Sequence, residues 1–356
     1  MRTAHRRRTT IGATGLWVLP LLLLAGCASR WTLRSATPPT PLQWPPAPGN
    51  AKVSYVAALT GFASRAGPGG ALRAIAFGSE AVDTGAFVLP VAVATGRDGR
   101  IAVADLGRAV VHVHVPGDRS YRQLSGAGRE RLVAPVGVAF DDELTLYVTD
   151  SSGRLFAFAP DGSLRYVRAS AGGAPLQRPT GVAFCPGNGA VYVVDTLANR
   201  VHAFAGSGDF LFSFGERGEQ GGQFNFPTHA FCSAAGEIFV ADSLNFRIQV
   251  FDERGAFRGE FGRHGDGSGD LAMPKGVAVD RDGVVYVVDA MFDNVQLFNR
   301  QGDFLLTLGQ RGTGFGEFWL PSGAFINEKG ELYVCDTYNR RVQLFRLSEG
   351  YASHAP

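Results

Sequence analysis

Short apolar runs recur along most of the chain, separated by turns rich in Gly, Asp and Asn. They hold β-branched and aromatic residues at successive or alternating positions, a pattern that predicts short strands rather than helices. Six runs close on an aspartate, and the intervals between these marker aspartates are 45, 45, 47, 47 and 47 residues. The marker aspartates are Asp105, Asp150, Asp195, Asp242, Asp289 and Asp336. A period in this range predicts a β-propeller, in which one four-stranded sheet repeats around an axis.

Each repeat predicts four strands. A proline starts the first strand, as in 274–279, and a polar turn leads to the strand that ends in the marker aspartate. A loop, a third strand such as 247–251, a turn with Gly and a fourth strand such as 302–309 complete the unit. Because the first strand is apolar at successive positions, we expect it to lie nearest the axis, buried on both faces. The sequence therefore predicts an all-β fold of six four-stranded antiparallel blades.

The ends of the repeat region predict how the ring closes. After Phe345 the sixth unit lacks its fourth strand, whereas 52–61 reads as a strand that belongs to no unit. An unpaired sheet edge invites aggregation, so we expect this N-terminal strand to complete the last blade. Between it and the first repeat, 71–77 carries apolar residues at helical spacing and predicts a short helix.

The consensus of the units resembles a known repeat. Pro-x-Gly-Val-Ala, Tyr-Val-x-Asp, Asn-x-Arg-Val-Gln-x-Phe and Gly-x-Phe-x-x-x-Phe-Gly follow one another, as in the NHL repeat. The chain is similar in particular to the six-bladed NHL propellers of bacterial lipoproteins. The resemblance covers residues 89 to 345, although the first two units lack the Asn-x-Arg loop. It implies a six-bladed NHL-type propeller over 51–348, with a C-terminal tail at 349–356.

The N-terminus predicts export and anchoring. Four arginines, an apolar stretch and Leu24-Ala-Gly-Cys27 follow one another, which is typical of a secretory signal too short to span a bilayer. The last four residues resemble a bacterial lipobox, which implies a signal peptide at 1–26 and a lipid on Cys27. An ordinary cleavable signal or, from Arg7-Arg8, a twin-arginine signal are the alternatives. Ala28 stands where inner-membrane retention would place Asp, which favours the outer membrane, facing the periplasm.

The composition of the chain limits the kinds of partner that we expect it to bind. Residues 27–50 hold six prolines and predict a semi-stiff, Pro-rich tether. The signal carries four arginines and no acidic residue, so its removal takes the formal net charge from +2 to −2, which argues against nucleic acid as a partner. We expect a monomer. The three remaining cysteines are too few for a disulfide framework; buried free thiols at Cys185, Cys232 and Cys335 are expected, with a Cys185–Cys232 bridge between neighbouring blades as the alternative.

Neighbouring strands of a blade run in opposite directions. The segment before each first strand and the loop after each marker aspartate are therefore expected on the same rim of the ring. We expect the marker aspartates to hold loop amides. The arginines of the Asn-x-Arg loops are expected to pair with them or to face the rim. Two positions break the repeat: His229 replaces a glycine, and Lys275 precedes one. The pair could hold an anion or a carboxylate; the alternative is a His229 packed and hydrogen-bonded in the rim with Lys275 solvated. The candidate rim residues are His229, Lys275, Met291, Phe292, Leu244, Phe246, Tyr338, Arg200, Arg247 and Arg341.

Two functions compete, beside a third option in which the ring is a purely structural scaffold of the envelope and no single rim residue matters. The favoured one is a membrane-anchored, non-enzymatic binding or scaffold module for a protein, peptide or small ligand, with no cofactor, metal or catalytic residue. NHL propellers also include a peptide-amidating lyase that holds zinc through histidines, and 224–229 is similar to a histidine-bearing segment of that family. A divergent metal-dependent lyase or hydrolase centred on His229 is therefore the alternative, although the equivalent positions carry Gly or Ala. The Gly-rich loops 215–222 and 309–316 lack a P-loop's ending and are expected to be connections.

Overall fold

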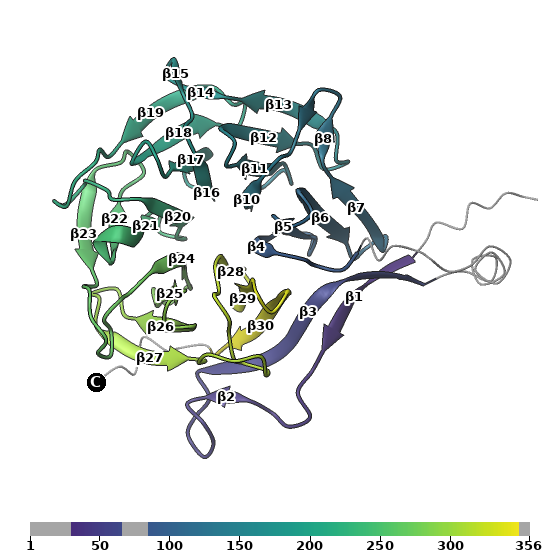
Figure 1. Cartoon of the computed structure of the whole chain (residues 1–356), viewed down its shortest axis with the longest axis vertical. Coiled ribbons are helices and arrows are strands. Elements are labelled where there is room, and N and C mark those ends of the chain that lie inside the picture. The colour runs from purple at the N-terminus through teal and green to yellow at the C-terminus, as the bar shows by residue number, and fades with distance from the viewer. Residues whose placement is uncertain (1–29, 66–84, 349–356) are drawn as a thin grey trace, which may run out of the picture.

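The computed structural model describes residues 30–65 and 85–348. The expected signal peptide, Cys27, the helix expected at 71–77 and the expected tail lie outside these residues. The described chain is built from strands, with a single 3-10 turn, η1 (Ser243–Asn245). Its strands form six antiparallel blades around a central axis (Figure 1), which confirms the predicted fold class. No helix among the described residues has the length and apolarity needed to cross a bilayer.

Five blades are each formed by four consecutive strands, ordered from the axis outward. Blade 1 holds β4 (Pro90–Thr95), β5 (Ile101–Asp105), β6 (Val110–Val115) and β7 (Ser120–Leu124). Blade 2 holds β10 (Pro135–Phe140), β11 (Leu146–Asp150), β12 (Arg154–Phe158) and β13 (Leu164–Arg168). Blade 3 holds β16 (Pro179–Cys185), β17 (Ala190–Asp195), β18 (Arg200–Ala205) and β19 (Phe210–Phe214). Blade 4 holds β20 (Pro227–Cys232), β21 (Ile238–Asp242), β22 (Arg247–Phe251) and β23 (Phe257–Phe261). Blade 5 holds β24 (Pro274–Val279), β25 (Val285–Asp289), β26 (Asn294–Phe298) and β27 (Phe304–Leu308).

Blade 6 joins the two ends of the chain. Its inner strands β28 (Ala324–Ile326), β29 (Glu331–Asp336) and β30 (Arg341–Leu347) come from the last repeat. Its next strand is β3 (Val53–Arg65), which pairs with β30 from Val53↔Leu347 to Leu59↔Val342. The prediction that an N-terminal strand completes the last blade is therefore confirmed.

The closure extends further than the sequence predicted. β1 (Arg30–Ala36) pairs along the outer side of β3, and β2 (Gln43–Trp44) pairs with its start. The Trp31 ring packs on Tyr121 of blade 1 at a centroid distance of 4.3 Å, and the Trp31 amide donates to the Arg119 carbonyl at 2.8 Å. The prediction of a tether over 27–50 is thus wrong for these strands, because both belong to the folded ring and β1 joins blade 6 to blade 1.

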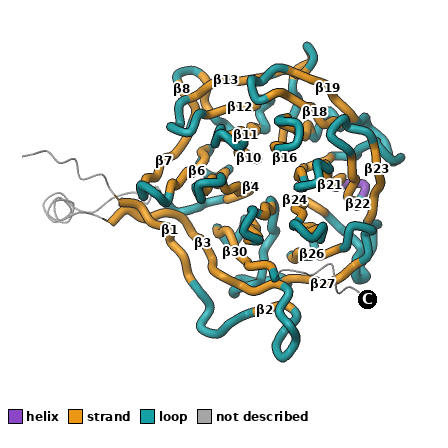
Figure 2. Tube along the Cα trace, turned by 180° about the vertical axis from the view of Figure 1, so that it is seen from behind, coloured by secondary structure: helices purple, strands orange, loops and turns teal. Residues whose placement is uncertain are grey.

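The pairing of first and second strands shows which strand ends lie at which end of the channel. In blades 1 to 5 the first-strand proline lies opposite the marker aspartate, as in Pro227↔Asp242 and Pro274↔Asp289. The residues before these prolines and after these aspartates therefore share one end of the channel, the loop rim. The turns between first and second strands share the other end, the turn rim. Figure 2 shows the inner strands around the axis from the opposite side.

A disulfide links two blades. Cys185, at the end of β16, is bonded to Cys232, at the end of β20, with their Cα atoms 5.4 Å apart. The expectation of free thiols is therefore wrong for these two residues, and the alternative, a bridge between neighbouring blades, is confirmed. Equivalent ends of neighbouring inner strands meet on the turn rim, and their separation lies within the range that a disulfide spans. Cys335 is free and buried, and burial raises the pKa of its thiol.

Two additional hairpins precede first strands in the early blades. β8 (Gly126–Ala127) and β9 (Glu130–Arg131) connect blade 1 to blade 2, and β14 (Ser170–Ala171) and β15 (Ala174–Pro175) connect blade 2 to blade 3. The later connections are the Gly-rich loops, and each carries one parallel bridge at the same position: Arg217↔Phe224, His264↔Leu271 and Arg311↔Phe318. These loops are connections, as the sequence predicted.

Candidate functional site: the loop rim and the channel

The marker aspartates hold the loop rim together from within. All six are fully buried. Asp195 accepts the Gln177 and Arg178 amides at 2.7 and 2.8 Å, and every other marker accepts at least one amide from the equivalent segment of its own blade. Burial opposes ionisation of Asp195, but hydrogen bonds from His202 and the loop amides outweigh it and lower its pKa. These carboxylates are committed to structure, as the sequence predicted.

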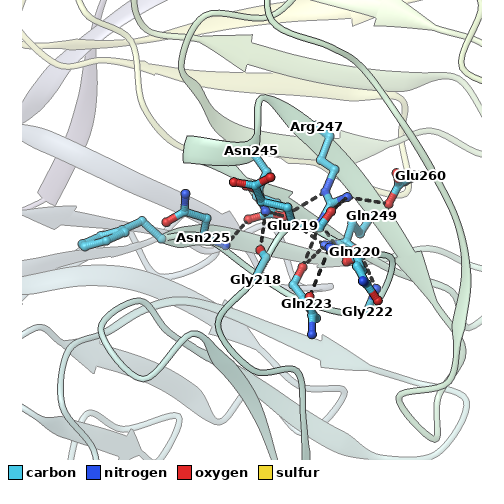
Figure 3. A network of polar contacts seen from close by, with 12 residues as sticks. Gly218, Glu219, Gln220, Gly222, Gln223, Asn225, Asn245, Arg247, Gln249 and Glu260 are labelled. Atoms are coloured by element: carbon cyan, nitrogen blue, oxygen red, sulfur yellow. Dashed lines mark hydrogen bonds and ion pairs between the residues drawn. The ribbon is translucent and has the colours of Figure 1, made fainter.

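Arg247 and Arg341 are buried and pair with marker aspartates, as one of the two expectations had it, so they are not exposed contacts of the rim. The Arg247 Nε donates to the Asp242 carboxylate at 2.9 Å, and its two terminal nitrogens donate to the Glu219, Gln220 and Gln223 carbonyls and the Glu260 carboxylate (Figure 3). Arg341 does the same with Asp336 and the carbonyls of the third Gly-rich loop. Each guanidinium thus ties a Gly-rich loop to a marker aspartate.

Arg200 occupies the position in blade 3 that Arg247 and Arg341 occupy in their blades, but its surroundings differ. Its side chain is exposed, and among the described residues it has no hydrogen-bond or ion-pair partner. The reason is the connection before blade 3, which is the β14–β15 hairpin rather than a Gly-rich loop, so no ring of loop carbonyls surrounds the guanidinium. Sequence equivalence alone could not separate Arg200 from the two braces.

Hydroxyl groups clasp neighbouring blades on the loop rim. Thr196, Ser243 and Thr337 each follow a marker aspartate and donate to the first-strand proline carbonyl of the next blade, Pro227, Pro274 and Pro90 respectively. Each hydroxyl also bonds a second hydroxyl, on Thr180, Thr228 or Ser322, at 2.8 Å. Blades 1, 2 and 5 lack this pair of hydroxyls, and in blade 5 Ala290 and Lys275 occupy the two places.

Lys275 lies half-buried at the inner mouth of the loop rim. Burial, and after it the charge of Arg178, lowers the pKa of Lys275. Among the described residues, its ammonium group has no hydrogen-bond or ion-pair partner. The two residues before each first-strand proline and the one after it include no other charged side chain than Arg178 and Lys275. At these positions the inner mouth therefore carries two cations, and the carboxylates nearest to them, the marker aspartates, are buried and hold loop amides.

Large apolar side chains gather around this mouth. Leu244, Met291 and Tyr338, all candidates from the sequence, are exposed, Met291 by 57%. Phe292 and Phe246 are half-buried, and Phe246 packs on His264 at 4.3 Å. The structure adds Val133, Leu197 and Trp319, and the Trp319 ring lies 5.6 Å from that of Tyr338. Leu197 stands at the same place after its marker aspartate as Leu244, Met291 and Tyr338, so sequence alignment could have found it.

His229 lies on the channel wall between blades 4 and 5. In four blades this place is a glycine, where a Cβ would collide with the next inner strand, as Gly181 would with the Cα of His229 at 2.6 Å. His229 instead fills the gap, and its Nδ1 accepts the Val277 amide of the next blade at 3.4 Å. Burial lowers the pKa of His229 to about 4, so the ring is neutral near pH 7, with its proton on Nε2.

Among the described residues, the other histidines lie away from His229. His112 bonds Asp105 and Tyr121 within blade 1, and His202 bonds Ser213 within blade 3. Within the described ranges no group of three His, Cys, Asp or Glu side chains has the arrangement of a metal site. His229 and Lys275 lie on neighbouring inner strands, but the imidazole lines the channel wall whereas the ammonium group lies at the mouth beside Arg178.

The channel holds a cavity that sequence reasoning missed. Its volume is about 360 Å³, and its lining runs from His229 to the turns of the turn rim, including Asp142 and Arg281. His229 is the lining residue nearest to the proline ends of the strands, so the cavity opens away from the loop rim. A signal was present in the sequence, because Phe231 and Phe325, which line the cavity, stand where the other four blades carry alanine.

Comparison with known proteins addresses the fold. A family model described as a 6-bladed beta-propeller matches residues 227–295 and 280–354. The chain is a six-bladed β-propeller. No curated protein matches its sequence significantly.

Solved propellers with this architecture have diverse roles. The gluconolactonase of Xanthomonas campestris is 17% identical with a TM-score of 0.57, covering 74% of this chain and 87% of that one. An auxiliary nutrient binding protein from Bacteroides thetaiotaomicron is 14% identical with a TM-score of 0.56, covering 75% and 71%. A virginiamycin B lyase from Staphylococcus aureus, solved with quinupristin, is 9% identical with a TM-score of 0.55, covering 89% and 100%. Identities this low establish a shared fold and nothing about activity.

Proposed function

We propose that this propeller is an exported binding module that holds a partner protein or peptide on its loop rim and performs no chemistry itself. The observation that carries the proposal is the set of exposed apolar side chains on that rim: Val133, Leu197, Leu244, Met291, Trp319 and Tyr338. Clusters of exposed apolar residues with a polar surround are typical of interaction sites, and aromatic side chains dominate binding energy.

The cations at the inner mouth suggest the partner's charge. Lys275 and Arg178 flank first-strand prolines on the same rim as these apolar side chains, and neither cation has an ion-pair partner among the described residues. A partner that places a carboxylate there would recover ion-pair energy that the free protein lacks, because a half-buried cation is poorly hydrated. The proposed partner segment is therefore apolar with at least one acidic group.

Export and anchoring are part of the proposal. The lipid on Cys27 would hold the ring at the cell envelope, with the outer membrane facing the periplasm as the favoured location. The Cys185–Cys232 disulfide supports an oxidising compartment, because such bonds persist outside the cytosol. The metal-dependent alternative has less support: His229 Nδ1 is already occupied by the Val277 amide, and equivalent positions in the other blades offer Gly or Ala.

The test is site-specific photo-crosslinking in cells that express the full chain. A photoreactive phenylalanine analogue replaces Met291 or Leu244 on the loop rim, or Leu211 on the outer strand β19 as a control of similar exposure, 49% against 57% for Met291. We expect the two rim positions to crosslink to the same partner and Leu211 to none. Lys275→Glu should weaken the crosslink without changing the melting temperature. Equal crosslinking from Leu211, or none from the rim, would refute the proposal.

A further inference from the structure

The cavity on the turn rim has features of a separate small-molecule site. Its volume of about 360 Å³ lies within the range of pockets that hold small ligands. It opens on the opposite end of the channel from the apolar loop rim, so it is not needed for the proposed partner. Its wall is formed by the inner strands of the ring, which makes it rigid.

Aromatic side chains give the cavity its chemistry. Phe140, Phe184, Phe231 and Phe325 line it and are each only partly covered. Phe231 and Phe325 come from blades 4 and 6, which are not neighbours, and their ring centroids are 6.4 Å apart. At their place in the strand, the four other blades carry alanine. Two blades thus direct a phenyl ring into the channel where the repeat would leave open space.

The polar groups of the wall are few. His229 lines the deep end, and with Nδ1 bonded to the Val277 amide, the neutral ring presents its Nε2 hydrogen as a donor. Asp141 and Asp280, where the wall meets the turns, are already engaged with turn amides and with the hydroxyls of Tyr147 and Tyr286. Charges of both signs lie farther out on the lip, among them Arg97, Asp142 and Lys329, where water screens them.

The disulfide also bears on this site. Cys232 lines the cavity and is bonded to Cys185, so one side of the lip is covalently fixed. A site that is rigid before binding loses little conformational entropy when its ligand enters.

We propose that this cavity binds a small, uncharged, flat and mostly apolar molecule that carries one hydrogen-bond acceptor. The phenyl rings contact the body of the ligand, and His229 Nε2 donates to the acceptor. A charged ligand would lose its hydration against a wall whose inner part has no charged side chain, which disfavours it.

The test uses the neutral dye Nile red, which is flat and carries a carbonyl acceptor, in fluorescence titrations of the protein without its first 27 residues. Ala234 and Ala235 are adjacent exposed residues of one turn, and only Ala234 lines the cavity. We expect saturable binding of one dye with a blue-shifted emission. Ala234→Trp should weaken it roughly tenfold or more, whereas Ala235→Trp should leave it within about twofold. Equal binding by the two variants would overturn the proposal, because the dye would then occupy another surface.

A second pair of measurements tests the ligand chemistry. His229→Phe keeps an aromatic ring but removes the donor, and the loss of one neutral hydrogen bond should weaken Nile red binding by roughly twofold to tenfold. The anionic dye 8-anilinonaphthalene-1-sulfonate should bind far more weakly than Nile red at this site. Unchanged binding in His229→Phe, or Ala234→Trp-sensitive binding of the anionic dye with equal affinity, would contradict the assignment. Circular dichroism melts confirm that each variant is folded.

Discussion

Cys185 and Cys232 are bonded to each other across the junction of blades 3 and 4, 47 residues apart in the chain. Their separation equals one repeat, so the two cysteines hold nearly equivalent places in successive blades. The bond ties two inner strands at the turn rim, whereas Thr196 and Pro227 tie the same two blades at the loop rim. This junction is therefore fixed at both ends of the channel.

Removing the disulfide should destabilise the ring. For Cys185→Ser with Cys232→Ser we expect a loss of about 2–4 kcal/mol in the free energy of unfolding, because the bond constrains the unfolded chain. Urea denaturation of the protein without its first 27 residues measures it. Thiol titration of the denatured, unreduced wild type should find Cys335 alone; three titratable thiols would contradict the bond.

Substitutions at Arg247 and Arg200, which hold equivalent places in blades 4 and 3, can be compared directly. Arg247→Met leaves the buried Asp242 carboxylate without its cation and the Gly-rich loop without its brace, so the free energy of unfolding should fall by roughly 3–5 kcal/mol. Arg200→Met removes an exposed side chain and should change it by less than about 0.5 kcal/mol. Chemical denaturation of both variants tests the difference, and similar losses would mean that Arg200 is also a brace.

His229 should make stability depend on pH. Its pKa is about 4 in the folded protein against 6.5 ordinarily, so between these values the unfolded chain binds more protons. The folded state is therefore favoured above about pH 6.5 and loses stability as the pH falls towards 4, by about 1.4 kcal/mol per unit of pKa difference. The stability difference between wild type and His229→Gln should shift against the wild type over this window. His264→Gln, at an exposed site, is the control, and parallel curves for wild type and His229→Gln would disprove the low pKa.

The staple between blades 6 and 1 predicts a role for Trp31. Trp31→Ala removes the ring that packs on Tyr121 and should lower the free energy of unfolding by about 1–3 kcal/mol. Leu33→Ala, on the same strand but 39% exposed, should have little effect. Thermal melts of the two variants make the comparison. Equal melting temperatures would show that β1 adds no stability to the ring.

The metal-dependent alternative makes a prediction of its own. A catalytic site centred on His229 would retain about one equivalent of zinc or another transition metal after purification without added metal. The binding-module proposal expects far less than one equivalent, unchanged by His229→Ala. Elemental analysis of the chelator-washed protein decides between them, since stoichiometric metal that is lost in His229→Ala would restore the enzyme hypothesis.

The sequence predicted the ring well because the repeat is encoded locally. The marker aspartates and first-strand prolines recur at a fixed spacing, and each unit carries its own turn residues, so six blades follow from pattern alone. Closure by β3 followed from counting strands. The strands β1 and β2 were not predicted, because the prolines near them indicated a tether. No residue close to Trp31 in the sequence indicates that its ring contacts Tyr121.

The candidate site was predicted less well, for physical reasons. Arg200, Arg247 and Arg341 look equivalent in the sequence, yet only the connection that precedes each blade decides whether a guanidinium is buried. The disulfide and the phenyl pair in the channel join different blades, so they depend on the ring geometry rather than on any single repeat. Lys275 could be singled out in the sequence because it breaks the repeat. Its lack of an ion-pair partner could not be predicted, because it depends on side chains from several blades.

The pairing of Val53 with Leu347 has a consequence for how the protein is made. The strand that completes the last blade is synthesised before any repeat, and it must wait for the final strand before it can pair. Contacts so distant in the chain slow folding, because a long loop closes before they form. Until β3 pairs with it, the outer edge of β30 stays unpaired. Loss of the last few residues of β30 up to Leu347 would therefore remove the pairings of Val53, Ser54 and Tyr55 and weaken the closure of the ring.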